Sequence, residues 1–213
     1  FLGFVNFIIL KKILKLIKNE KKSYIIILSI LSLALINIFF YRIGEHGTDR
    51  SAQIILLLVF IQLLEIINDK NLNDINITNR ILILCTLAIS LKVFYFIYLS
   101  LFFLIIFHQK TKINFLINLF KNKISYICLL MISLLLITNV MNSGCLIYPM
   151  SATCFENLSW SIPIQEVNDM NQWYQQWSKG GATPNFSVEN PEIYIQNLNW
   201  LSNWIDIYFF NKV

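Results

Sequence analysis

Long apolar runs separated by short polar segments make up most of this chain, and they predict helices that cross a membrane. Residues 24–41 form a complete span, while residues 52–67 and 125–140 form shorter ones. A helix needs roughly 20 apolar residues to cross the hydrocarbon core of a bilayer. Residues 1–10 are also apolar but too few to cross, so we expect them to be the end of a span that begins upstream.

Lysine clusters set the expected orientation of these spans. Residues 11–22 and 108–123 are rich in lysine, and lysine-rich segments beside a span lie mostly on the cytoplasmic side. Residues 42–51 and 141–213 then fall on the extracytoplasmic side, and the polar stretch 68–80 returns to the cytoplasm.

The apolar stretch 81–107 contains one interruption, Lys92. Because both flanking loops are expected in the cytoplasm, an even number of crossings is needed between them. We therefore predict a hairpin of two short helices, residues 81–91 and 93–107, that turns at Lys92. The alternative is one long tilted span, which would place the lysines of the following loop on the wrong side.

The C-terminal segment, residues 141–213, contains all five tryptophans of the chain. Tryptophan is enriched where a membrane meets water, because its ring is apolar and its N–H needs a hydrogen-bond partner. The pattern predicts two helices that lie along the outer membrane surface. The first begins near Pro163 and ends at Gly180, and the second begins with Asn190 as its N-cap and carries the last two tryptophans.

Composition agrees with a membrane protein. Hydrophobic residues make up 56% of the chain and charged residues only 14%, whereas a soluble domain carries about 25% charged residues. The basic residues lie mainly between apolar runs, which argues against nucleic-acid binding.

These patterns together predict an all-α fold. We expect a polytopic transmembrane helical bundle over residues 1–140, followed by an extracytoplasmic, Trp-rich segment of interfacial helices over residues 141–213. The chain begins at Phe1 and ends at Val213 within apolar runs. We therefore expect an internal fragment of a longer protein of the bacterial inner membrane.

A polar cluster follows the first complete span and holds Arg42, Glu45, Asp49 and Arg50. A carboxylate on an outer loop near the membrane can act as a general base on an acceptor hydroxyl, so Asp49 and Glu45 are the candidate catalytic residues. Arg42, Arg50 and Lys92 are the candidate ligands of a lipid phosphate, because cationic side chains bind phosphate oxygens. The alternative is a solvated loop whose charges hold the helix ends at the membrane surface.

Cys145 and Cys154 share one predicted outer loop and are expected to form a disulfide, because that compartment is oxidising and their separation closes easily. The alternative is two free thiols. Glu65, near the end of a predicted span, is either a functional group that faces the bundle or a side chain that reaches the cytoplasmic surface. The two histidines are expected on opposite sides of the membrane, so the sequence indicates no metal site and calls for no cofactor.

Three stretches carry a family resemblance: residues 41–58, 142–163 and 176–185. They resemble a family of bacterial polytopic membrane proteins of uncharacterised function. In that family a Ser-Gly-Cys or Ser-Gly-Tyr follows a span, then Tyr-Pro or Phe-Pro, then an aromatic W-x-x-P element. The matching residues here are Ser143, Gly144, Cys145, Tyr148, Pro149, Trp160 and Pro163.

That family is similar to the GT-C glycosyltransferases, membrane enzymes that use polyprenyl-phosphate-linked sugars. The resemblance implies a cell-envelope protein that takes a lipid-linked sugar sideways from the bilayer. GT-C enzymes place a catalytic Asp or Glu on their first outer loop, which here would lie upstream of Phe1, and Asp49 would then belong to a supporting loop. Activity of this chain is therefore left open, and the alternatives are a transporter or flippase and a structural membrane subunit.

Overall fold

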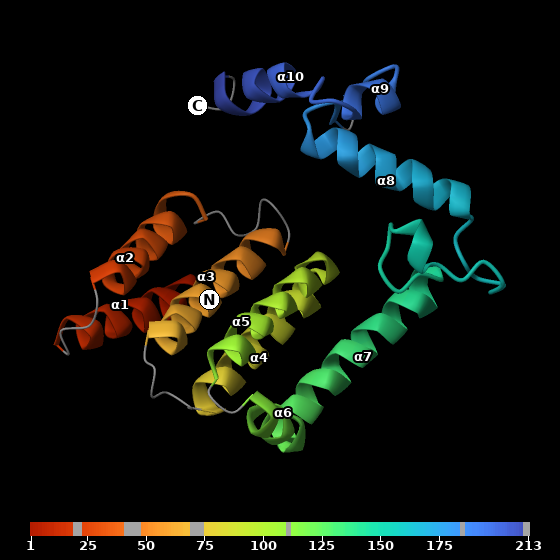
Figure 1. Cartoon of the computed structure of the whole chain (residues 1–213). Coiled ribbons are helices and arrows are strands. Elements are labelled where there is room, and N and C mark those ends of the chain that lie inside the picture. Colours follow the sequence, from red (N-terminus) through yellow and green to blue (C-terminus); the bar gives the residue numbers. More distant parts are fainter. Residues whose placement is uncertain (19–22, 41–47, 69–74, 110–111, 184–185, 211–213) are drawn as a thin grey trace. The chain divides into compact units, whose positions relative to one another are not determined.

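A computed structural model describes residues 1–18, 23–40, 48–68, 75–109, 112–183 and 186–210 (Figure 1). The chain divides into two compact units, unit 1 at residues 1–135 and unit 2 at residues 136–213, and each is described by itself. Nearly all of the regular structure is helical, so the predicted all-α class is confirmed. The exception is one pair of two-residue strands in unit 2.

Unit 1 is built from helices alone over its described residues. They are α1 (Leu2–Lys18), α2 (Ser23–Ile38), α3 (Asp49–Asn68), α4 (Ile75–Leu91), the 3-10 helix η2 (Val93–Ser100), α5 (Leu101–His108), α6 (Lys112–Lys121) and the first part of α7 (Lys123–Ser143).

Helix α3 is the centre of unit 1. One set of its buried residues, including Ile54 and Leu58, packs against α1 and α2. A second set, including Leu63, packs against α4, α5 and α6. A third set, near the start of α3, packs against the end of α4 and against Tyr95 of η2. Because α3 is covered on several sides, its apolar residues do not form a single stripe as they would on a surface helix.

The predicted hairpin is present as a pair of antiparallel helical segments. Lys92 has an extended backbone with φ of −156° and ψ of 120°, which ends α4 before η2 begins. Tyr95 packs against the end of α4 at Ala88, whereas Ile105 packs against its middle at Ile81. The chain therefore reverses at Lys92 and runs back along α4 (Figure 1).

Several helix boundaries differ from the apolar runs of the sequence. Helix α1 continues through the lysine cluster to Lys18, because Ile13 and Leu16 extend its buried face. Helix α4 begins at Ile75, inside the stretch that we expected to be a polar loop. The basic segment 108–123 likewise contains helix α6. A count of consecutive apolar residues misses such amphipathic turns, because only one side of each is buried.

Polar side chains join the helices of unit 1 at several points. The amides of Asn6 and Asn37 exchange hydrogen bonds of 2.9 and 3.1 Å between α1 and α2. Lys12 Nζ lies 2.9 Å from Glu65 Oε2, which ties α1 to the last turns of α3. Between apolar helices such contacts act as specific links, since few other polar partners are within reach.

Helix α7 differs from α3 in that the other described residues bury little of its surface. It and α3 are the two described helices that are long and apolar enough to cross a membrane, yet only 6% of the most apolar part of α7 is buried, against 50% in α3. Its exposed large apolar residues are Tyr126, Ile127, Leu129, Leu130, Met131, Leu134, Ile137 and Met141.

Unit 2 contains the end of α7, a 3-10 turn η3 (Ser151–Thr153), α8 (Ile164–Ser178), the strands β1 (Ala182–Thr183) and β2 (Phe186–Ser187), α9 (Pro191–Ile195), α10 (Leu201–Ile205) and the π-helical turn η4 (Asp206–Phe210). Helix α8 begins directly after Pro163, as predicted. On its apolar face Val167 is buried, whereas Met170, Tyr174 and Trp177 are exposed.

The prediction of one continuous helix from Pro191 through the last tryptophans is wrong. Helix α9 ends at Ile195, and α10 is a separate helix that begins after Trp200. Asn197 and Leu198 lie between them with positive φ angles of 50° and 62°, a conformation that a right-handed helix cannot contain. The side chain of Asn190 also makes no capping hydrogen bond to α9.

The packing of α3 against α4 predicts a sensitivity to added volume. Ala88 is fully buried against α3, so Ala88→Leu should lower the free energy of unfolding in detergent by about 1–3 kcal/mol. The neighbouring Leu87 is 46% exposed, so Leu87→Phe, which also adds volume, should leave stability nearly unchanged. Equal effects of the two variants would mean that α3 and α4 are not packed as described.

Candidate functional site

Asp49 and Lys92, which the sequence placed on different loops, form an ion pair in unit 1. Lys92 Nζ lies 2.7 Å from Oδ1 of Asp49 and donates a 2.8 Å hydrogen bond to Oδ2. The side chain of Asp49 is 39% exposed and that of Lys92 is 49% exposed. Asp49 is also in the first turn of α3, where the helix dipole favours negative charge.

The backbone around this ion pair is held by neighbouring side chains. Thr48 Oγ1 donates a 2.9 Å hydrogen bond to the carbonyl of Leu91, the last residue of α4. The hydroxyl of Tyr95 donates a 3.4 Å hydrogen bond to the carbonyl of Asp49. The start of α3 is therefore attached to the α4–η2 turn by two hydrogen bonds as well as by the ion pair.

Arg50 lies beside the ion pair but points toward the end of α2. Its Nη1 donates a 2.6 Å hydrogen bond to the carbonyl of Phe39. A cavity of about 370 Å³ is lined by Phe39, Phe40, Asp49, Arg50 and Gln53. Its lining combines a cation, an anion, an amide and two aromatic rings, so it offers both polar and apolar contacts to a ligand.

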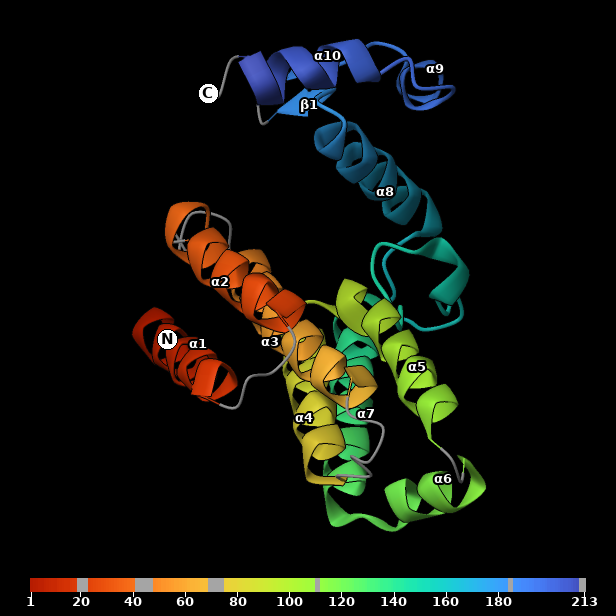
Figure 2. The ribbon, with the colours of Figure 1, turned by 60° about the vertical axis from the view of Figure 1, so that its left-hand side comes forward.

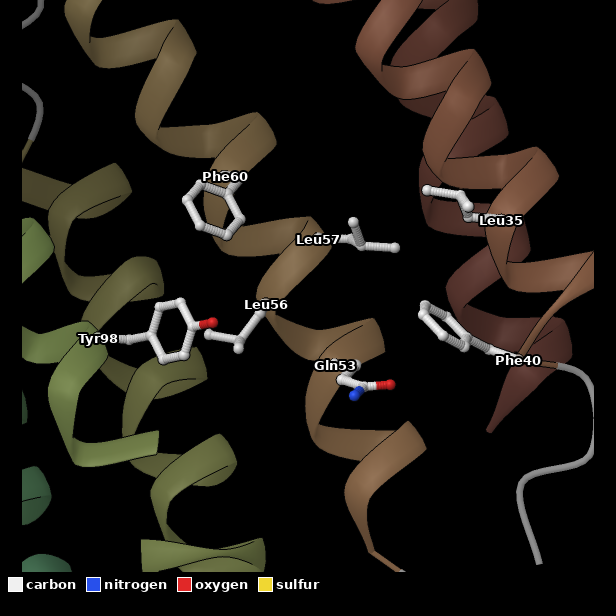
Figure 3. A pocket seen from close by; sticks show the side chains of 7 residues that line it. All are labelled: Leu35, Phe40, Gln53, Leu56, Leu57, Phe60 and Tyr98. Atoms are coloured by element: carbon white, nitrogen blue, oxygen red, sulfur yellow. The ribbon is translucent and has the colours of Figure 1, made fainter. Parts of the chain in front are cut away.

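A second, apolar cavity adjoins the first along α3. It has a volume of about 160 Å³ and shares the side chains of Phe40 and Gln53 with the polar cavity. Figure 3 shows its lining, in which Leu35 and Phe40 face α3 from the α2 side. Tyr98 is on η2, and the remaining lining residues come from α3: Gln53, Leu56, Leu57 and Phe60. The two cavities together form a groove that is polar at the start of α3 and apolar farther along it.

The other members of the predicted outer-loop cluster, Arg42 and Glu45, lie outside the described residues. Sequence reasoning did not find Tyr95 and Gln53, although they contact or line the same region. Both residues are uncharged and lie within predominantly apolar segments of the sequence, where neither suggests a site. Tyr95 reaches this region because η2 folds back toward the start of α3, and Gln53 lines the polar cavity one turn after Asp49 on α3.

Glu65, the ionisable residue of the second span, has a specific partner. It is paired with Lys12, so it is neither a free charge in the bundle nor simply a side chain that extends to water. Among the described residues, no group of three or more His, Cys, Asp or Glu side chains lies close enough to hold a metal ion.

The predicted disulfide between Cys145 and Cys154 is present in unit 2. Their Cα atoms are 3.8 Å apart, and the two residues also form an isolated antiparallel bridge. Thr153 stabilises the loop between the cysteines, because its hydroxyl accepts a 3.1 Å hydrogen bond from the backbone N–H of Ile147. The loop between the cysteines is therefore closed by covalent and backbone contacts together.

The motif residues of the same region shape this loop. Gly144 has a positive φ of 78°, and a Cβ there would overlap Ser161 and lie 2.9 Å from its Cα. Trp160 Nε1 donates a 3.2 Å hydrogen bond to the carbonyl of Val140 at the end of α7. The Tyr148–Pro149 peptide bond is cis. The contacts of Gly144 with Ser161 and of Trp160 with Val140 thus bring the chain back to the end of α7.

A second group of contacts organises the end of unit 2 around Gly180 and Gly181. Asn203 Nδ2 donates hydrogen bonds of 3.1 Å to the Gly180 carbonyl and 2.9 Å to the Tyr194 hydroxyl. The Tyr194 ring occupies the space that a side chain at Gly181 would need. Lys179 Nζ lies 5.6 Å from the ring centre of Trp200, within the range of a cation–π contact.

The structure thus defines a protein of the all-α class, with an Asp49–Lys92 ion pair beside an amphipathic groove in one unit and a disulfide-closed loop in the other. The chain belongs to the family described as a domain of unknown function (DUF8201), whose model matches residues 1–213. No curated protein and no solved structure matches the chain.

The surroundings of Gly144 and Gly3 predict different effects when each glycine is replaced by alanine. Gly144→Ala should lower the free energy of unfolding by about 1–3 kcal/mol, because the left-handed conformation and the contact with Ser161 both disfavour a side chain. A Cβ added at Gly3, the second residue of α1, would meet nothing within 4 Å, so Gly3→Ala should not lower stability. Thermal unfolding in detergent would measure both, and a stabilising Gly144→Ala would contradict the loop geometry.

Proposed function

We propose that the chain is part of an integral membrane protein that crosses the bilayer several times. The observation that carries this proposal is α7, whose exposed surface is largely apolar and which is almost uncovered by the other residues that the structure describes. A helix of this kind is stable when its surroundings are apolar as well. A lipid bilayer is the simplest such environment for a helix of 21 residues.

The spacing of charged pairs along α3 supports the same proposal. The Asp49–Lys92 pair lies at one end of α3, and the Lys12–Glu65 pair lies near the other. Residues 51–64 between them contain no charged side chain. Asp49 and Glu65 are separated by about 24 Å along the helix axis, close to the roughly 30 Å thickness of a hydrocarbon core.

Basic side chains gather at the Glu65 end of unit 1. Lys12 pairs with Glu65 there, Phe115 of α6 packs beside Ile66 of α3, and Asn122 donates a 2.9 Å hydrogen bond to Asn79 near the start of α4. The basic residues of these neighbouring segments are Lys11, Lys12, Lys15, Lys18, Arg80, Lys112, Lys121 and Lys123. By the positive-inside rule, this end faces the cytoplasm.

We further propose that the groove at the opposite end binds a lipid-linked sugar phosphate, as the resemblance to GT-C glycosyltransferases implies. The polar part would receive the phosphate at Arg50, and the apolar part beside Phe40 and Leu57 would receive the start of the lipid chain. Arginine suits this role because its N–H groups match phosphate oxygens. The neighbouring Lys92 can add positive charge.

The ion pair defines what Asp49 can do in such a site. Lys92 Nζ contacts both carboxylate oxygens of Asp49, so an acceptor hydroxyl would have to compete with Lys92 for them. Asp49 would therefore act as a general base only when Lys92 turns to a bound phosphate, and otherwise it orients Lys92. A transporter or flippase has less support, because Glu65 and Lys92, the charges on which that alternative rested, are both paired.

The proposed topology predicts which positions an impermeant thiol reagent reaches. In a background with Cys85→Ala and Cys128→Ala, Ser178→Cys should react in intact cells, and Lys112→Cys should react only after the membrane is opened. Ser178 and Lys112 are both exposed within the structure, so accessibility to reagent reports the side of the membrane. Labelling of residue 112 in intact cells would overturn the orientation.

The lipid-phosphate site predicts a loss of affinity specific to Arg50. Arg50→Gln should weaken binding of a polyprenyl phosphate by about tenfold or more, because a charge-assisted hydrogen bond contributes roughly 1.5–3 kcal/mol. Arg80→Gln makes the same change at the basic end and should leave affinity unchanged. Native mass spectrometry of the detergent-solubilised full-length protein would measure both, and equal losses would contradict a site at Arg50.

A further inference from the structure

Helix α6 has two apolar sides, only one of which is covered by unit 1. Phe115 is buried in the core cluster formed with α3, α4 and α5. On the opposite side Ile113, Ile117 and Phe120 are 73%, 45% and 69% exposed. Their spacing of four and three residues places them in one stripe along the helix.

The charges around this exposed stripe have one sign. Lys112 and Lys121 are at the two ends of α6 and Lys123 begins α7, and all three are exposed. No acidic residue occurs from residue 112 to residue 123. An exposed apolar stripe bordered by lysines is typical of helices that lie in the interface of an anionic membrane.

The placement of α6 agrees with an interfacial position. Figure 2 shows α6 crossing the end of unit 1, whereas α4 and α5 run along its length. This is also the end at which the basic residues of α1 and α4 gather near Glu65. A helix that crosses the cytoplasmic end of a bundle is positioned to meet lipid headgroups.

We propose that α6 is an interfacial helix that binds anionic lipid headgroups on the cytoplasmic leaflet. Ile113, Ile117 and Phe120 enter the boundary between headgroups and acyl chains, and Lys112, Lys121 and Lys123 contact headgroup phosphates. This inference rests on the membrane placement proposed above but not on the lipid-linked sugar site. Each lysine near an anionic surface strengthens attachment by roughly fivefold.

Fluorescence quenching in nanodiscs tests the contact. In the Cys85→Ala, Cys128→Ala background, a small fluorophore is attached to Phe120→Cys, to Asn118→Cys or to Leu130→Cys of the whole chain. Nitroxides placed near the lipid headgroup quench it, in phosphatidylcholine with or without phosphatidylglycerol. Asn118 is the matched control, since it is also exposed on α6 but lies outside the apolar stripe.

We expect stronger quenching at residue 120 than at residue 118, and a larger difference when phosphatidylglycerol is present. Replacing Lys112, Lys121 and Lys123 by Gln should remove the effect of phosphatidylglycerol. If quenching at residue 120 does not exceed that at residue 118, the proposal is overturned. Another protein segment that covers the stripe would give this result. Equal quenching in both lipids would overturn its headgroup part.

Residue 130 separates the two proposals. Leu130 is on the exposed apolar surface of α7, so nitroxides placed deep in the acyl region should quench a fluorophore there. Quenching at residue 130 without excess quenching at residue 120 would refute the interfacial role of α6 alone. No quenching at residue 130 by any nitroxide would refute the membrane placement itself.

Discussion

Unit 1 depends on one physical constraint, the burial of α3 by helices on several of its sides. Three groups of apolar residues on this single helix serve the contacts with α1 and α2, with α4 and η2, and with α5 and α6. Close packing makes these contacts interdependent, because a change in one neighbour moves the helix that all of them share. The same helix carries Asp49, Arg50 and Gln53, so the packing of α3 in the core also sets the positions of these groove residues.

Ionic contacts at the two ends of α3 give this packing its register. Apolar contacts are not directional and tolerate small shifts along a helix axis. Asp49 with Lys92 at the start, and Glu65 with Lys12 near the end, each join α3 to a particular residue of another segment. The Asp49–Lys92 pair is partly exposed, and in water such a pair contributes little, whereas near lipid an unpaired charge is costly and the pairing matters more.

Unit 2 follows a different principle, since local covalent and backbone contacts dominate it. The Cys145–Cys154 disulfide, the positive φ of Gly144 and the bond from Trp160 to Val140 fold the chain after α7. Farther along, Tyr194 and Asn203 secure the turn at Gly180 and Gly181. Residues that carried the family resemblance thus have demonstrable structural roles, so the motif alone does not identify a catalytic residue.

The sequence by itself determined the all-α class, the turn at Lys92, the start of α8 after Pro163 and the Cys145–Cys154 pair. Each depends on local chemistry: apolar run length, a charge inside a run, proline geometry, or two cysteines close along the chain. Only the tertiary structure decided that Asp49 pairs with Lys92, that Glu65 pairs with Lys12, and that the helix after Pro191 breaks at Asn197. The residues of each ion pair are more than 40 positions apart, and beside the break Lys179 Nζ donates a 3.3 Å hydrogen bond to the carbonyl of Ile195. These features therefore depend on contacts between residues distant in the sequence, which local pattern does not reveal.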